Sequence, residues 1–198
     1  ALVRESVQNS LDAALPDQSV RVGIRLRRGD LGLKHERASW YMAGLASHLH
    51  AANVTSAPNA ADRRPMDYLV IEDFHTTGLL GDPRRGKTPK PGEPENWYWF
   101  WWHVGGSGKS GGRLGRWGLG RTVFAAASDV RSFFAFTERS SDQRTFLMGQ
   151  ARIAQHEVAG VEFVPDGFFC DPASKEEEVW APFADKSVIE RARADFGL

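Results

Sequence analysis

The chain has 198 residues, of which 41% are hydrophobic and 25% are charged. This length fits one domain, and the composition is that of a globular protein, which excludes the sparsely hydrophobic and highly charged class of disordered chains. Basic and acidic residues number 25 each, so the formal net charge of zero provides no general attraction to nucleic acid or to membranes.

Two further properties of the sequence bear on where the protein works. Cys170 is the one cysteine, which excludes an internal disulfide framework and a cysteine-based zinc site and is typical of a reducing compartment. No apolar run approaches the roughly 18 residues that span a bilayer, and no basic-then-apolar leader opens the chain. We therefore expect a cytoplasmic protein without a membrane partner. Because Ala1 already falls within a helical pattern, we also expect a segment before residue 1, and Leu198 is a second candidate boundary.

The first third of the chain alternates between helical and strand patterns. Apolar residues recur every three or four positions in two segments, which predicts helices, and they alternate with arginines or run together in two others, which predicts strands. The expected elements are a helix over 1–15 that ends before Pro16, a strand over 19–28, a helix over 34–52, and a buried strand over 68–71 that ends at Glu72 and Asp73.

The rest of the chain begins with a long segment rich in glycine and proline, residues 76–120, which contains the aromatic block 97–102. Loops beyond roughly 12–15 residues are uncommon unless they bind something, so residues 84–120 predict a functional lid or insertion. The aromatic block could stack on a base, but such a block is more often core or interface. Helices precede and strands follow, which predicts an α+β two-layer sandwich of helices on a mixed, mostly antiparallel sheet. The remaining expected elements are a helix over 121–128 and strands over 130–137, 145–154 and 158–164.

Charge is unevenly distributed along the sequence. Residues 84–121 contain eight basic and two acidic residues, whereas residues 155–198 contain four basic and ten acidic ones. The central segment is therefore suited to bind an anion, and nucleic acid is one candidate partner for it.

Three polar residues share one face of the predicted first helix. At about 100° per residue, Glu5, Asn9 and Asp12 fall within roughly 60° of one another, opposite an apolar stripe that includes Val3 and Leu11. Any solvated helix face has this pattern. The functional alternative is that Glu5 orients a water as general base while Asn9, one turn later, is an oxygen ligand to Mg²⁺.

A second candidate site follows the predicted buried strand. The Asp73 carboxylate could accept a hydrogen bond from an exocyclic amine, and such an acceptor discriminates adenine from a base with a carbonyl in that position. The alternative is structural, with Asp73 and Thr76 capping a turn.

A third candidate site is the glycine series Gly115, Gly118 and Gly120, which leads into the helix expected over 121–128. Glycine lets the backbone approach phosphates closely, and the free N–H groups at the start of the following helix favour an anion. A flexible linker would have a similar composition.

A phosphate-binding P-loop is a rival interpretation of the segment just before these glycines. Residues 106–110 end in Gly-Lys-Ser, but a P-loop needs a glycine five residues before Gly108 and a helix directly afterwards. Position 103 is a histidine, and the pair Gly111 and Gly112 opens a helix poorly. The sequence therefore disfavours the P-loop.

Taken in order, the three candidate sites resemble the ATP-binding motifs of the GHKL superfamily, which includes gyrase B, the Hsp-type chaperone ATPases, MutL, MORC proteins and histidine kinases. The sequence departs from the second motif of the family at two positions. His75 stands where a glycine is usual, and Gly78 comes one residue later than the motif glycine. The fourth motif of the family is not identifiable. The resemblance implies a Bergerat-type ATP-binding fold, with Glu5 as the general base, Asn9 as the Mg²⁺ ligand, and ATP contacts from Asn9, Asp12, Asp73, Gly78, Gly115, Arg116, Gly118, Leu119, Gly120 and Arg121.

The activity that the resemblance implies is Mg²⁺-dependent ATP binding and hydrolysis, which acts as a conformational switch and drives formation of a homodimer. Two alternatives stay open. A histidine kinase catalytic domain would transfer phosphate, but such domains usually lack a glutamate at the position of Glu5. A nucleotide-gated interaction module would bind ATP without useful turnover.

Overall fold

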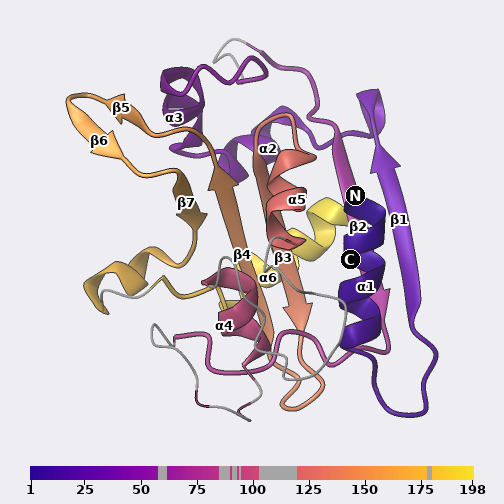
Figure 1. Cartoon of the computed structure of the whole chain (residues 1–198). Helices are drawn as coiled ribbons and strands as arrows, with labels where there is room; N and C mark the ends of the chain where they lie inside the picture. Colours follow the sequence, from indigo (N-terminus) through magenta and orange to yellow (C-terminus); the bar gives the residue numbers. More distant parts are fainter. Residues whose placement is uncertain (58–61, 85–89, 91–92, 94, 103–119, 178–179) are drawn as a thin grey trace.

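The structure is a computed structural model, and it describes residues 1–57, 62–84, 90, 93, 95–102, 120–177 and 180–198 (Figure 1). In this part of the chain, helices and antiparallel sheets are combined in a mixed α/β architecture that is compatible with the α+β class. No helix in it is long and apolar enough to cross a membrane. The helices are α1 (Leu2–Asp12), α2 (His35–Tyr41), α3 (Leu45–Ala51), α4 (Asn96–Trp101), α5 (Gly120–Ala126) and α6 (Lys186–Phe196), and the strands are β1 (Arg21–Arg27), β2 (Tyr68–Phe74), β3 (Ser132–Glu138), β4 (Thr145–Arg152), β5 (His156–Val158), β6 (Val161–Phe163) and β7 (Asp166–Phe169).

The strands form three separate sheets, in which every neighbouring pair is antiparallel. Strands β1 and β2 make a two-stranded ribbon, with Ile24 opposite Ile71 and Leu26 opposite Leu69. Strands β3, β4 and β7 make a second sheet with β4 in its centre, and β5 and β6 form a short hairpin. The expected mixed sheet is therefore replaced, in the described residues, by antiparallel sheets alone.

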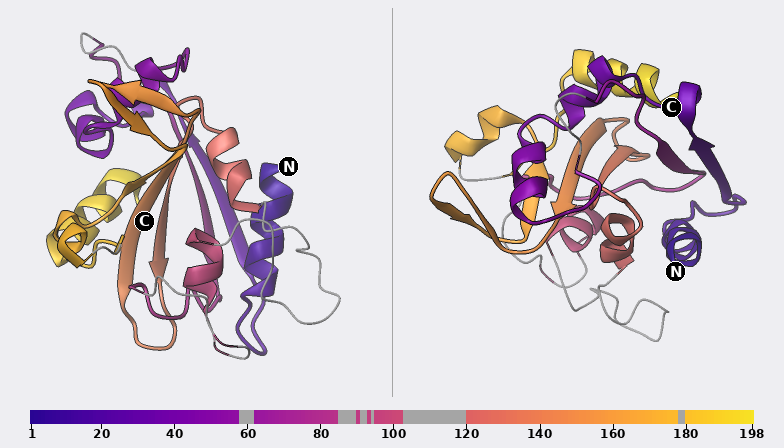
Figure 2. Two further views of the ribbon diagram at one scale, coloured as in Figure 1. Left: turned by 60° about the vertical axis from the view of Figure 1, so that its left-hand side comes forward. Right: turned by 90° about the horizontal axis from the view of Figure 1, so that it is seen from above.

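Helices cover both faces of the β3-β4-β7 sheet, whereas the sequence predicted a single helix layer (Figure 2). The physical reason lies in β4, where consecutive apolar side chains point to opposite faces. Leu147 packs with residues of α2 and α6 on one face. Phe146 and Met148 pack against Trp97 and Trp101 of α4 on the other.

Three of the predicted segments fold differently from the expectation. The strand expected over 158–164 is broken by a turn at Ala159 and Gly160, both with positive φ, and is part of the β5–β6 hairpin. The helix expected over 34–52 is split into α2 and α3 at Gly44, whose φ of 77° lies in the left-handed region. The aromatic block, expected inside a long loop, contains α4, and its Trp97 and Trp101 are buried. The interpretation of this block as core is therefore confirmed for these two residues.

The buried side of α1 differs from the one that its apolar stripe predicts. The predicted helix is present, but Val3 and Leu11 are exposed, and the small polar side chains Ser6 and Ser10 are buried. Ser6 satisfies its hydroxyl group within the helix, since Ser6 Oγ donates to Leu2 O at 3.0 Å, and Ser10 Oγ lies 2.9 Å from Ser6 O. The buried face of α1 is therefore the one that carries Ser6 and Ser10, whereas Glu5 is partly buried and Asn9 is exposed.

Candidate functional site

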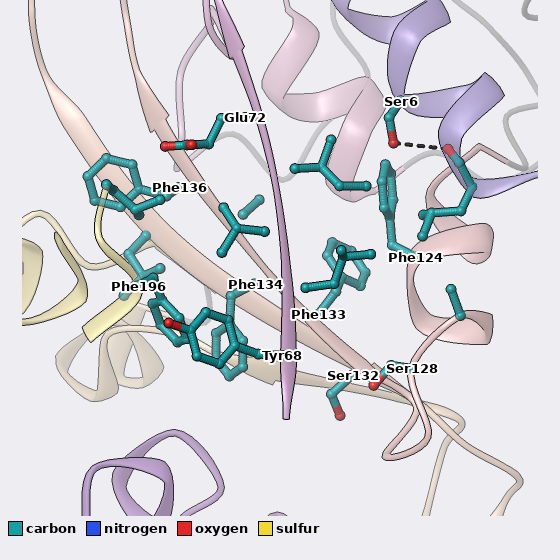
Figure 3. Close-up of a pocket in the computed structure, with 18 of the residues that line it drawn as sticks. Ser6, Tyr68, Glu72, Phe124, Ser128, Ser132, Phe133, Phe134, Phe136 and Phe196 are labelled. Carbon is teal, nitrogen blue, oxygen red and sulfur yellow. Dashed lines mark hydrogen bonds between the residues drawn. The ribbon is translucent and has the colours of Figure 1, made fainter. Parts of the chain in front are cut away.

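A large cleft of about 3030 Å³ separates the β1–β2 ribbon from the β3-β4-β7 sheet. Helix α1 and strand β2 line it on one side, and α5 and β3 line it on the other. Figure 3 shows β2 running through this region, with Phe124 and Phe133 on the same side of the strand as Ser6. Helices α1 and α5 lie next to each other along this side of the molecule (Figure 1).

The cleft brings together the first two candidate sites of the sequence. Glu5, Asn9 and Asp12 line it from α1, and Asp73 and Gly78 line it from the end of β2 and the turn that follows. These two groups are more than 60 residues apart in the chain, and a hydrogen bond joins their elements directly, because Ser10 Oγ donates to Asp73 Oδ2 at 2.8 Å.

Strand alternation decides which of the two acidic residues at the end of β2 enters this side of the cleft. Asp73 faces α1, whereas Glu72 lies on the other face and pairs with Arg25 at 3.0 Å between Oε2 and Nη2. Figure 3 shows Glu72 above Phe136, away from Phe124. Only Asp73 of this pair is therefore placed beside the α1 residues.

The turn after Asp73 is closely bonded to the end of α1. Leu15 N donates to His75 O at 2.9 Å and Thr77 N donates to Ala13 O at 2.8 Å, while Thr76 Oγ1 donates to the other oxygen of Asp73 at 3.0 Å. The capping contact predicted between Asp73 and Thr76 is therefore confirmed. It also leaves lone pairs on the carboxylate, since each oxygen can accept two hydrogen bonds.

His75 occupies the turn in the conformation that a glycine adopts easily. Its φ of 65° lies in the left-handed region, and its Nδ1 donates to Ser19 O at 2.8 Å. The backbone of His75 therefore has a conformation that a glycine at this position could also adopt.

Gly78 is required by space as well as by its backbone angle. Its φ is 69°, and a Cβ at this position would lie 2.5 Å from the carbonyl oxygen of Glu138. Gly78 therefore lets the turn rest directly on the end of β3. The resemblance implied an ATP contact for Gly78 and did not indicate this structural role.

The two polar residues that suggested metal chemistry are accessible. Asn9 is exposed and Glu5 is partly buried, and both line the cleft one helical turn apart. Asp12 accepts a hydrogen bond from Gln8 Nε2 at 3.3 Å. No group of three or more histidine, cysteine or acidic residues capable of holding a metal is found among the residues that the structure covers. An Mg²⁺ held by Asn9 would therefore take most of its oxygen ligands from water and phosphate, as Mg²⁺ commonly does.

An aromatic wall, which the sequence analysis missed, closes the apolar side of the cleft. Phe124 of α5 packs on Phe133 of β3 with ring centroids 5.5 Å apart, and Phe100 of α4 lies 6.2 Å from Phe133. All three residues line the cleft. The sequence placed Phe133 in an apolar strand, but nothing in it indicated which face of that strand would line the cleft.

The third candidate site falls almost entirely outside the described residues. Gly115, Arg116, Gly118 and Leu119 are not among them, and Gly120 and Arg121 form the beginning of α5, as the sequence predicted for a helix at this point. The residues that follow, including Phe124, place α5 along the cleft next to α1.

Comparisons of the chain with protein-family models, with curated proteins and with solved structures find no match.

Proposed function

We propose that this chain is a GHKL-type ATP-binding domain with a Bergerat-type arrangement of its site, and that it hydrolyses ATP with Mg²⁺. The observation that carries the proposal is the hydrogen bond between Ser10 and Asp73, which joins the helix of the first motif to the strand end of the second. The two motifs can form one site only if the fold brings them together. Residues of both motifs line the same cleft, which supports the proposal.

The proposed base-binding end of the cleft combines one acceptor with apolar walls. The Asp73 carboxylate, fixed by Ser10 and Thr76, accepts the exocyclic amine of adenine. Phe124 and Phe133 provide the flat apolar surface that a purine needs on its faces. Guanine presents a carbonyl where adenine has the amine, so Asp73 would face it without a hydrogen bond.

The proposed phosphate end lies along α1. Asn9 supplies an oxygen ligand to the Mg²⁺ that accompanies the triphosphate, and Glu5, one turn earlier, orients the attacking water and takes its proton. Asp12 completes this polar row, and residues Gly115 to Arg121 are assigned to the phosphates on the sequence motif alone. The basic segment 84–121 supplies positive charge for the same anion, and nucleic acid is a second candidate ligand for it.

The biological role that follows from such a site is a nucleotide-driven conformational switch, with ATP promoting a homodimer in the cytoplasm. Glu5 lines the cleft beside Asn9, which favours hydrolysis by water over the phosphotransfer of a histidine kinase.

The decisive experiment measures phosphate release and ATP binding for Glu5→Ala and Asn9→Ala. Glu5→Ala is expected to bind Mg-ATP like the wild type and to lower turnover by roughly 10²–10⁴, the usual contribution of a general base. Asn9→Ala is expected to lose the Mg²⁺-dependent part of ATP binding in calorimetric titration. The matched control is Glu36→Ala, which removes an exposed glutamate that does not line the cleft.

The outcomes separate the proposal from its rivals. Unchanged turnover in Glu5→Ala would remove Glu5 from the mechanism. Tight ATP binding by the wild type without multiple turnovers would indicate a nucleotide-gated interaction module, and no ATP binding at all would overturn the proposal.

A further inference from the structure

Two buried serines on α1 differ in a single contact. Ser6 and Ser10 lie one turn apart on the buried face of the helix, and each hydroxyl lies within 3.0 Å of the carbonyl oxygen four residues earlier. Ser10 Oγ is in addition 2.8 Å from Asp73 Oδ2, a contact that Ser6 lacks.

The Ser10 hydroxyl has one proton and two nearby acceptors. The ionised carboxylate of Asp73 is the stronger acceptor, because charge-assisted hydrogen bonds are shorter and about twice as strong as neutral ones. The carbonyl of Ser6 is already within the hydrogen-bond ladder of the helix. The proton of Ser10 therefore points to Asp73, and the bond is protected from water, since Ser10 is only 3% exposed.

The Asp73 carboxylate is held at both of its oxygens. Ser10 Oγ donates to Oδ2 from one side, and Thr76 Oγ1 donates to Oδ1 at 3.0 Å from the turn. Asp73 itself is exposed at the edge of the cleft, so without these bonds its side chain would be free to rotate toward solvent. Its two remaining lone-pair positions can accept a donor from a ligand.

We infer that Ser10 is a positioning residue that holds the Asp73 carboxylate toward the cleft and thereby sets the preference of the site for a base with an exocyclic amine. This inference rests on the proposed ATP-binding function and identifies the residue that makes its base recognition selective. Ser10 directly follows Asn9, so the same turn of α1 fixes the base acceptor and carries the proposed metal ligand.

The test compares Ser10→Ala with Ser6→Ala. Both variants remove one buried hydroxyl from the same helix face and gain helix propensity, but only Ser10→Ala leaves Asp73 without its donor from α1. Ser10→Ala is expected to weaken ATP binding and to reduce the preference for ATP over GTP by roughly tenfold, the scale of one charge-assisted hydrogen bond. The effect should fall on KM and leave kcat nearly unchanged. Ser6→Ala is expected to retain the wild-type preference.

The possible failures can be told apart. If the wild type binds ATP selectively and Ser10→Ala keeps the same ATP-to-GTP ratio, the role of Ser10 is wrong and the proposed function stands. If the wild type binds neither nucleotide, the proposed function is wrong and the role of Ser10 falls with it. Should Ser10→Ala not fold, Ser10→Cys replaces the hydroxyl by a weaker donor of similar size and is expected to reduce the preference in the same direction.

Discussion

The two larger sheets of the molecule are buried to very different degrees. In the β3-β4-β7 sheet the central strand is enclosed on both faces, and Leu147 is only 1% exposed. In the β1–β2 ribbon, apolar side chains remain in contact with solvent, and Leu26 is 59% exposed although it sits opposite Leu69. Figure 2 shows helices on both sides of the β3-β4-β7 sheet. The exposed apolar side chains of the ribbon show that it is covered less completely than this sheet.

This difference separates a scaffold from a candidate site. The described polar residues assigned to catalysis or to the base lie on α1 or at the end of β2, on the less buried side, whereas the aromatic residues assigned to the base lie on α5 and β3. Regions with few buried apolar contacts open at lower free energy than the core, and binding sites are commonly drawn from them. The β3-β4-β7 sheet provides the rigid wall against which such a site can close.

The largest effect is expected from breaking the scaffold. Trp101 is fully buried, and its ring stacks on Phe133 with centroids 5.7 Å apart and planes within 3° of parallel. Trp101→Ala is expected to lower the free energy of unfolding by about 3–5 kcal/mol, because a large cavity is left in a packed core. Urea denaturation monitored by circular dichroism would measure the loss.

The matched substitution in the ribbon is Leu26→Ala, for which a change within about 0.5 kcal/mol is expected because the side chain is already in contact with water. A loss as large as that of Trp101→Ala would contradict the comparison. It would mean that the ribbon face is covered in solution, and a sedimentation measurement would then show whether a second copy covers it.

Much of the secondary structure could be predicted from the sequence, because apolar periodicity reports it directly. The helix of α1 and the strands β1 to β4 occur where the patterns placed them. The pattern failed where a short element gives no periodic signal. Helix α4 has six residues and lies in a segment rich in glycine and proline, and Gly44 interrupts a pattern that otherwise continues through α3.

The candidate site was predictable only in part, for a different reason. The residue types at Glu5, Asn9 and Asp73 indicated chemistry, but their meeting depends on which face of α1 packs. The apolar stripe of α1 suggested the wrong face. Ser10 was missed because nothing in the sequence distinguishes a serine that bonds only to its own helix from one that also bonds to a carboxylate 63 residues away.

A second, smaller effect is expected where the two regions touch. The turn after β2 rests on the end of β3, with Leu79 N donating to Thr137 Oγ1 at 2.9 Å and Ser140 N donating to Thr77 O at 3.1 Å. Gly78→Ala would place a Cβ 2.5 Å from the Glu138 carbonyl oxygen at a φ of 69°. We expect a loss of about 1 kcal/mol for the backbone angle and a further 1–3 kcal/mol for the clash.

Gly44→Ala isolates the first of these two contributions. Gly44 also has a positive φ, of 77°, but no atom lies within 4 Å of its would-be Cβ. Its substitution should therefore cost only about 1 kcal/mol in the same urea experiment. Equal losses for the two variants would show that the contact between the turn and β3 relaxes freely, and the ribbon would then be less firmly joined to the scaffold than the hydrogen bonds indicate.

A histidine pair links two elements at the periphery of the molecule, helix α3 and the β5–β6 hairpin. His48 Nδ1 lies 2.8 Å from His156 Nε2, and both rings pack on Phe163. His156 Nδ1 donates to Ala154 O at 2.8 Å, so the neutral ring must accept at Nε2 and His48 must donate. Strand alternation places Glu157 and the residue opposite it, Glu162, on the other face of the hairpin, so neither offsets a charge on the pair.

The smallest expected effect is a pH dependence of stability that originates at this pair. Burial, and to a lesser extent the neighbouring His156, lower the pKa of His48 below its ordinary value of 6.5. The unfolded chain therefore binds more protons than the native one as the pH falls through about 6.5. The free energy of unfolding is therefore highest above that pH and decreases below it. Wild-type protein should lose more stability between about pH 7.5 and about pH 5.5 than His48→Gln.

His50→Gln, which changes an exposed histidine on the same helix, should behave like the wild type. Parallel urea curves at the two pH values would measure the difference, and an equal loss in wild type and His48→Gln would assign the pH dependence to other groups.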